Sequence, residues 1–247
     1  MKEKILSEIK EVLEKVSPNL TTEQKSRMYR IINPNISNYI IYGIKTTVIE
    51  RIVKEIDNKY KSSYSVAVEV FKSLSGSNVE EYKFAGLFFI NRYKKFFNAS
   101  TINLFKTEFL NHCNTWSYCD SSCIRVLGPF LAKNGNENLA KKTIDDWTSY
   151  DNIWVRRASM VILLKIIMLK KDFEENYVFN HIKKMLKYAD QNYIEKAIGW
   201  LLKTCSKYKP EIIFDYLMRN KTIFSRLILR YASEKLSKDK ITQVLKK

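Results

Sequence analysis

Apolar positions recur at the spacing of an amphipathic helix along almost the whole chain. In the first segment, charged residues separate the apolar positions Ile5, Ile9, Leu13 and Val16. The same pattern predicts helices over 46–60, 62–74, 79–97, 100–112, 115–132, 137–147, 151–171, 173–189, 191–208 and 210–219, and a last helix or pair over 222–246. Ser100 and Asp151 stand where helix N-caps are expected. No segment alternates like a strand between turn residues, so the pattern predicts an all-α protein.

The predicted helices are also regularly spaced. Starts near Val79, Thr115, Asn152 and Asn192 lie 36, 37 and 40 residues apart. Two helices per unit at this period are typical of the HEAT and armadillo classes, in which neighbouring units stack to bury their apolar faces. We therefore expect one HEAT-like helical solenoid over 1–247, with N-terminal helices in 1–40, stacked repeats in 41–247 and a concave basic groove. An irregular helical bundle stays open as an alternative.

The composition of the chain excludes several other classes of fold and site. The chain of 247 residues has six glycines and four prolines, fewer than β-sandwiches and barrels need for their turns. The glycines form neither a dinucleotide-binding fingerprint nor a phosphate-binding loop. The two histidines exclude a site with several histidine ligands.

The net charge of +17 points to a polyanionic partner. Residues 201–247 alone carry +8, from 12 basic and 4 acidic residues. DNA, RNA or an anionic membrane surface would each attract such a chain. The longest apolar stretch, Val161 to Leu169, is interrupted by Lys165 and is too short to span a bilayer. The charged N-terminus lacks a secretory signal, so we expect a cytoplasmic protein with reduced cysteines.

Three of the four tryptophans have a charged residue one helical turn away. These neighbours are Asp120 for Trp116, Arg157 for Trp154, and Lys196 and Lys203 for Trp200. Taken singly, each tryptophan is most simply a core residue, because its large apolar area favours burial. Arg157 alone is most simply a solvated or ion-paired residue.

Asp120 lies in a segment without net charge, in a chain that is otherwise basic. A carboxylate in a cationic groove stays ionised, since positive charge nearby lowers its pKa. Such a carboxylate can stabilise a sugar cation while an N-glycosidic bond breaks. If the base is already cationic through alkylation, it leaves neutral and needs no general acid. Indole faces attract cations by about 0.5–2 kcal/mol, which would favour a cationic nucleotide.

A group of three cysteines and one histidine raises the question of a metal site. His112, Cys113, Cys119 and Cys123 lie close in sequence, but their spacing matches no zinc pattern. We expect buried reduced thiols, no metal and no cofactor.

Three segments together resemble the AlkD-type DNA alkylation repair glycosylases. Residues 115–120 (TWSYCD) resemble the W-x-x-x-D motif of that family, and 151–158 (DNIWVRRA) its D-N-x-W-x-x-R helix start. Residues 193–200 (YIEKAIGW) resemble its Q-K-A-I-G-W stretch. Residues 42–46 (YGIKT) are similar to its aromatic-glycine entry to the second repeat, so the resemblance covers about 40–240.

The resemblance implies a HEAT-like solenoid that excises cationic N3- and N7-alkylated purines from double-stranded DNA, as a monofunctional glycosylase and a monomer. Asp120 would stabilise the sugar cation, and Trp116 and Trp200 would contact the deoxyribose. The remaining expected DNA contacts are Arg157, Lys203, Trp154, Arg156 and Lys196.

The chain departs from the family pattern at three places. Lys203 stands where the family has an arginine, which keeps the charge but loses bidentate phosphate binding. Thr46–Thr47 replaces Thr-Pro, and Asn33–Ile36 replaces a basic, aromatic stretch, so no DNA contact is carried over to the N-terminal segment. Two alternatives therefore stay open: a non-catalytic DNA-binding protein of the same fold, and a protein-interaction scaffold.

Overall fold

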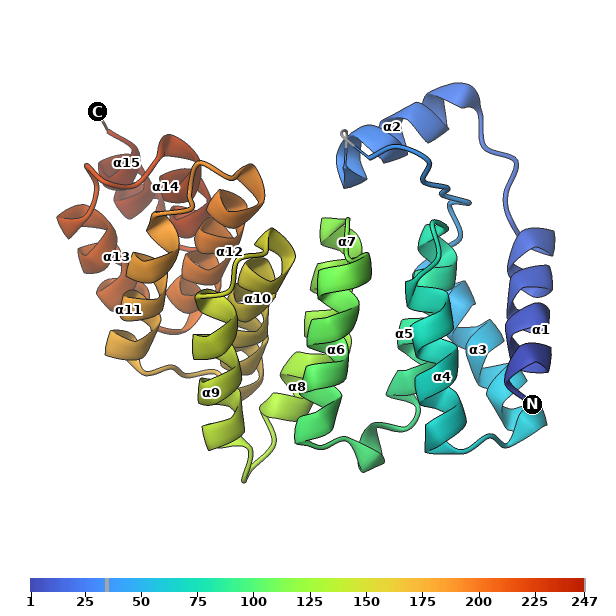
Figure 1. Ribbon diagram of the computed structural model, residues 1–247. Coiled ribbons are helices and arrows are strands. Elements are labelled where there is room, and N and C mark those ends of the chain that lie inside the picture. Colours follow the sequence, from blue (N-terminus) through green and yellow to red (C-terminus); the bar gives the residue numbers. More distant parts are fainter. Residues whose placement is uncertain (34–35, 247) are drawn as a thin grey trace. The chain divides into compact units, whose positions relative to one another are not determined.

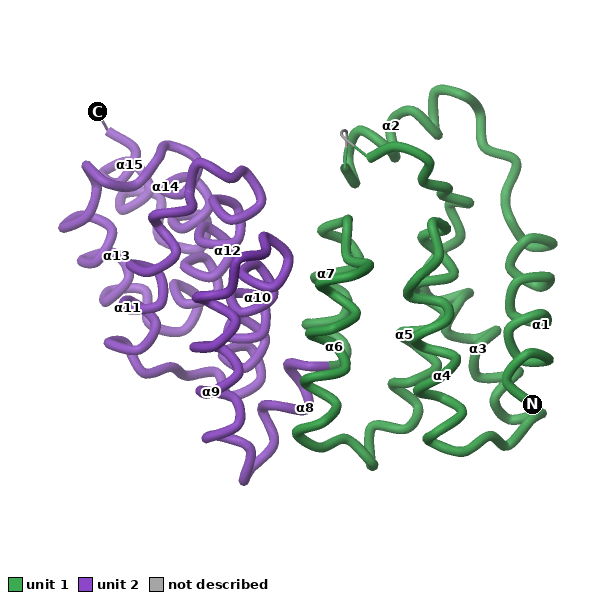
Figure 2. The backbone as a smooth tube through the Cα atoms, viewed as in Figure 1, with its two compact units in different colours: residues 1–126 green, residues 127–247 purple. Residues whose placement is uncertain are grey.

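A computed structural model describes residues 1–33 and 36–246. The fold is an all-α helical repeat, as the sequence predicts. The described residues contain no named strand, and one isolated bridge pairs Ile40 with Val79. The chain forms two compact units, Met1–Val126 and Leu127–Lys247 (Figure 2), and each is described by itself. A single repeat domain over 1–247 stays a prediction.

The first unit contains seven α-helices and a short 3₁₀ helix, η1 (Figure 1). Their bounds are α1 Lys2–Lys15, α2 Thr22–Ile32, α3 Thr46–Tyr60, α4 Tyr64–Ser75, α5 Glu80–Asn91, η1 Lys94–Phe96, α6 Ala99–His112 and α7 Trp116–Ser122. Helix α5 is the centre of this unit and packs against α1, α3, α4 and α7. Its residues Glu80 to Ile90 are all buried, which explains why α5 lacks the polar stripe of a surface helix.

The second unit continues the chain from α8 (Figure 1). Its helices are α8 Gly128–Leu131, α9 Glu137–Thr148, α10 Ile153–Lys170, α11 Glu175–Leu186, α12 Asn192–Tyr208, α13 Pro210–Arg219, α14 Arg226–Ser233 and α15 Lys238–Leu245. Helices α10, α12 and α14 pack in a row, and α9, α11 and α13 pack against members of that row. The starts of α5, α7, α10 and α12 match the predicted repeat spacing to within one residue.

The helix predicted over 115–132 is helical from Trp116 to Leu131, but it is not a regular α-helix throughout. It consists of α7, a π-helical turn over Cys123–Leu127 and the short α8. Pro129 has no N–H to donate to the Arg125 carbonyl, so a regular α-helix cannot run through this point. Similarly, the helix predicted over 79–97 ends at Asn91, and η1 follows it.

The two predicted N-caps are also corrected. The cap of α6 is Asn98, whose side chain accepts from the Ser100 backbone N–H at 2.9 Å. The cap of α10 is Asn152, whose side chain accepts from the N–H groups of Trp154 and Val155. In both places asparagine satisfies free N–H groups of the first turn, the usual role of an N-cap.

None of the helices in the described part of the chain has both the length and the apolar character needed to cross a bilayer.

Gly199 allows α12 and α14 to approach closely. A Cβ atom at position 199 would lie 2.7 Å from Cβ of Tyr231 on α14 and 3.6 Å from Cα of Ile228. This contact gives the glycine of the A-I-G-W stretch a packing role.

We expect Gly199→Ala to lower the free energy of unfolding by about 1–3 kcal/mol, because the new methyl group overpacks the α12–α14 contact. Chemical denaturation measures the change. Gly76→Ala is the control: its Cβ would meet only the His112 ring at ordinary distances, and Gly76 has a negative φ. Equal losses in both variants would contradict the packing role of Gly199.

His181 lies buried on α11, with its Nδ1 atom 3.0 Å from the Thr148 hydroxyl oxygen on α9. Burial lowers the pKa of His181 from 6.5 to about 3, and nearby Lys184 contributes. Between these two pKa values the unfolded chain binds a proton that the folded protein excludes.

The protein should therefore lose stability as the pH falls below about 6.5, by about 2 kcal/mol from this group at pH 5. Unfolding of the wild type and of His181→Gln is compared at pH 7 and pH 5. The wild type should lose more stability than the variant over this range. An identical pH dependence would show that His181 does not titrate as described.

Candidate functional site

Helix α7 carries two of the predicted site residues. Thr115 is its N-cap, and its hydroxyl oxygen accepts from the Tyr118 backbone N–H at 3.3 Å. Trp116 begins the helix, and Asp120 follows one turn later on the same face. The Trp116 side chain is partly exposed, whereas Asp120 is 7% exposed.

Trp116 also contacts α2. Its indole N–H donates to the Ile31 carbonyl at 2.9 Å, and the Asn33 amide donates to the Asn114 carbonyl at 2.8 Å. Helix α2 contributes no buried residue of its own. These hydrogen bonds therefore link the C-terminal end of α2 to the start of α7.

Two charged residues that the sequence analysis missed lie beneath the start of α7. Glu80 and Lys83 occupy the first turn of α5, and both are buried. Burial raises the pKa of the Glu80 carboxyl and lowers the pKa of the Lys83 amine. The sequence feature that could have identified them is a pair of charges one turn apart at the start of an apolar helix, because charges buried there need fixed partners.

In the second unit, the first turn of α10 presents Trp154 and Arg157 toward α12. The rings of Trp154 and Tyr193 have centroids 5.0 Å apart. The Arg157 guanidinium donates to the Tyr193 carbonyl. Both Trp154 and Arg157 are buried, so the start of α12 fixes their orientation.

Arg156 has different partners from Arg157. Its guanidinium lies over the Tyr188 ring, 3.7 Å from the centroid, and donates to the Asp151 carboxylate at 2.6 Å. Arg156 is also buried, so its charge needs partners. The Tyr188 ring and the exposed Asp151 carboxylate stabilise it.

Helix α12 carries the other predicted residues, Lys196, Trp200 and Lys203, one turn apart. All three side chains are partly exposed. The Lys203 ammonium forms an ion pair with Glu234 at 2.6 Å, and this contact lowers the pKa of the Glu234 carboxyl.

The structure thus groups the predicted residues within each unit. Trp116 and Asp120 share α7, while the other six residues lie on the packed helices α10 and α12. A single site made from both groups stays a prediction.

The cysteines Cys113, Cys119, Cys123 and Cys205 are buried free thiols. Burial raises the pKa of the Cys123 thiol, with smaller contributions from Cys119 and the neighbouring Asp120. In the described residues, no group of three or more His, Cys, Asp or Glu side chains has the arrangement of a metal site. The absence of a metal stays a prediction.

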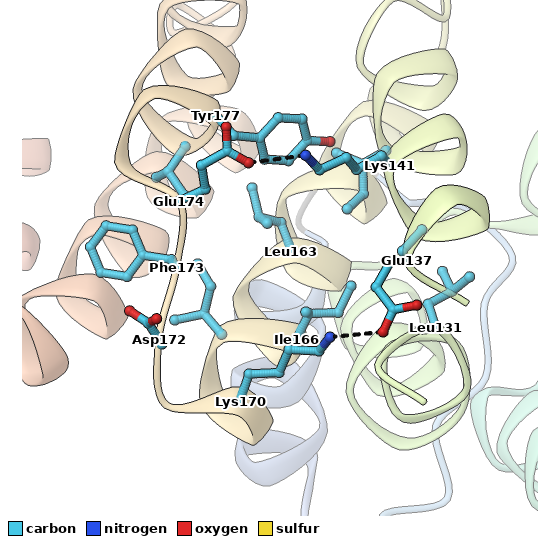
Figure 3. Close-up of a pocket in the computed structure, with 14 residues that line it drawn as sticks. Leu131, Glu137, Lys141, Leu163, Ile166, Lys170, Asp172, Phe173, Glu174 and Tyr177 are labelled. Carbon is cyan, nitrogen blue, oxygen red and sulfur yellow. Dashed lines mark hydrogen bonds and ion pairs between the residues drawn. The ribbon is translucent and has the colours of Figure 1, made fainter. Parts of the chain in front are cut away.

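A pocket of about 240 Å³ lies in the second unit, between α9, α10 and α11 (Figure 3). Side chains such as Leu163, Ile166 and Phe173 line it. Two ion pairs border it, Lys141–Glu174 at 2.9 Å and Lys170–Glu137 at 3.4 Å. None of the predicted site residues lines this pocket, so it is not a candidate for the predicted chemistry.

Comparison with known proteins gives one family. Residues 9–236 match the family model described as DNA alkylation repair enzyme. Among solved structures, a "predicted DNA alkylation repair enzyme from Enterococcus faecalis" is similar, with a TM-score of 0.70 and 18% identity. That similarity covers 90% of this chain and 100% of the other, and it supports the fold alone. No curated protein matches the chain.

Proposed function

Because the chain belongs to the family of DNA alkylation repair enzymes, we propose that it is a monofunctional DNA glycosylase. Its substrates would be cationic N3- and N7-alkylated purines, such as 3-methyladenine and 7-methylguanine, in duplex DNA. The observation that carries this proposal is the placement of Asp120 one helical turn after Trp116 on α7. An acidic group one helical turn from an indole suits a reaction in which positive charge develops on a sugar.

The proposed reaction breaks the bond between C1′ and the base nitrogen. The bonding electrons go to the base, which was cationic and leaves neutral. The sugar becomes an oxocarbenium-like cation, and the Asp120 carboxylate stabilises it. Water then adds at C1′ and releases its proton to solvent, leaving an abasic site for later base excision repair steps. No general acid, metal or cofactor takes part.

The other residues would bind the DNA around this centre. Trp116 and Trp200 would contact the deoxyribose of the damaged nucleotide, while Arg157 and Lys203 would contact phosphates. Arg156, Trp154 and Lys196 complete the proposed DNA-binding set. Duplex binding by the +17 chain should weaken steeply with salt, because phosphate contacts release counterions.

A second function, non-catalytic DNA binding by the same helical repeat, is favoured by two observations. Asp120 is almost fully buried, and Glu234 neutralises Lys203 at 2.6 Å. This function retains the DNA contacts and releases no base. Release of 7-methylguanine or 3-methyladenine from alkylated duplex separates the two functions.

We expect Asp120→Asn to lower the single-turnover excision rate by about 100-fold, because the neutral amide cannot stabilise the sugar cation. Duplex affinity should stay within about threefold, since the change removes no phosphate contact. Asp215→Asn, at an exposed position on α13, is the control and should retain full activity.

The assay has two adverse outcomes. If Asp120→Asn excises bases as fast as the wild type, Asp120 has no role in the mechanism. No base release by the wild type, with duplex binding intact, would replace the glycosylase proposal with the non-catalytic function.

We expect Arg157→Ala to weaken binding to damaged and undamaged duplexes alike, and to reduce the slope of log affinity against log salt by about one. Arg157→Lys is the matched control: it keeps the charge and should preserve the slope. Fluorescence anisotropy at several salt concentrations gives both values, and thermal unfolding checks the loss of the contact with Tyr193. An unchanged slope in Arg157→Ala would contradict a phosphate contact.

A further inference from the structure

We propose that Glu80 is a positioning residue that fixes the orientation of Trp116 from beneath α7. That Trp116 faces a damaged nucleotide rests on the proposed function. The positioning itself rests on contacts within the first unit.

Glu80 is 5% exposed and lies in the first turn of α5. One carboxylate oxygen, Oε1, accepts from the Ser117 hydroxyl. The other, Oε2, accepts from the Tyr39 hydroxyl and lies 3.4 Å from the Thr115 hydroxyl. A buried carboxylate needs fixed partners of this kind, and here two of the three belong to the start of α7.

The two α7 partners are the residues on either side of Trp116. Thr115 also caps the helix, so its hydroxyl connects Glu80 to the first turn of α7. With the backbone held at positions 115 and 117, the direction in which Trp116 leaves the helix is fixed. The Trp116 indole N–H also donates to the Ile31 carbonyl, which restricts the rotation of the ring.

Lys83 holds the segment that precedes α7. Its ammonium donates to the His112 carbonyl and to the Asn114 side-chain oxygen, the latter at 3.2 Å. The rings of Tyr39 and Tyr118 each lie with their centroids 5.6 Å from the ammonium nitrogen. Glu80 and Lys83 therefore hold consecutive parts of one segment, and Glu80 is the one that acts directly on the neighbours of Trp116.

Glu81 provides a matched control in the same turn of α5. It is buried as well, and its carboxylate accepts from the N–H groups of Tyr42, Gly43 and Ile44 at 3.0, 2.7 and 3.2 Å. Gly43 has φ +82, so this turn favours glycine. Glu81 thus anchors the entry to α3, whereas Glu80 anchors α7.

The direct test is ¹⁹F NMR of protein labelled with 5-fluorotryptophan. The four tryptophans give separate signals, and loss of one signal in Trp116→Phe assigns Trp116. Glu80→Gln should shift or broaden the Trp116 signal and leave that of the buried Trp147 on α9 unchanged. Glu81→Gln should leave the Trp116 signal in place. An unchanged signal in Glu80→Gln, or an equal shift in Glu81→Gln, would overturn the proposal.

A second variant covers the possibility that Glu80→Gln does not fold. Ser117→Ala removes one donor to Glu80 and leaves Tyr39 and Thr115 in place. It should move the Trp116 signal in the same direction by a smaller amount. No movement in folded Ser117→Ala would also overturn the proposal.

A double-mutant cycle tests whether Glu80 acts through Trp116. Glu80→Gln should lower the single-turnover excision rate about tenfold in the wild type and have no further effect in Trp116→Phe. Glu81→Gln should leave the rate unchanged even if it unfolds at a lower denaturant concentration. Equal effects of Glu80→Gln in both backgrounds would show a general structural role.

Failure of the glycosylase proposal would look different. If the wild type releases no base, the same cycle is measured on duplex affinity, while the ¹⁹F result stands independently. A shifted Trp116 signal with no excision would keep the positioning role and reject the enzyme. If the wild type releases base and the Trp116 signal does not shift in Glu80→Gln, the enzyme is kept and the positioning role is rejected.

Discussion

A charged side chain buried in a helix must find fixed partners, and α5 buries Glu80, Glu81 and Lys83 in its first turn. Each of them holds a different piece of backbone. Glu81 binds consecutive N–H groups at 42–44, Glu80 binds side chains at the start of α7, and Lys83 binds the segment before it. Because these partners come from distant parts of the sequence, one helical turn sets the relative placement of three segments in the first unit. Loss of all the partners of one of these side chains would leave a buried charge unsatisfied, which is a larger penalty than the hydrogen bonds alone contribute.

The second unit fixes its candidate residues in a related way. Trp154 and Arg157 leave the first turn of α10 and both meet Tyr193 at the start of α12, one through its ring and the other through its carbonyl. The close approach permitted by Gly199 then fixes α12 against α14. The side chains proposed to contact DNA therefore depend on helix packing that is complete in the free protein, and such pre-organisation lowers the ordering cost of binding.

The sequence allowed prediction of the helices, their spacing and the family, because each of these leaves a periodic or local signal. The π-helical turn before Pro129 was missed, and so were the caps at Asn98 and Asn152, where several residues compete for each helix boundary and tertiary packing decides among them. The roles of Glu80 and Lys83 could not be predicted. Their partners lie about 30 to 40 residues away, and no sequence pattern says which hydroxyl or carbonyl will meet a buried charge.

Helix α2 differs from every other long helix of the first unit, because it inserts nothing into the core. Its own capping box, formed by Thr21 and Gln24, stabilises it locally. Local opening free energies range from almost zero to the full stability of a protein, and segments without buried contacts lie at the low end. Helix α2 is held instead by polar contacts, among them the hydrogen bond from the Trp116 indole N–H to the Ile31 carbonyl. The placement of α2 therefore depends on a few polar contacts at its C-terminal end, and loss of the Trp116–Ile31 hydrogen bond would weaken its attachment without opening a cavity in the core.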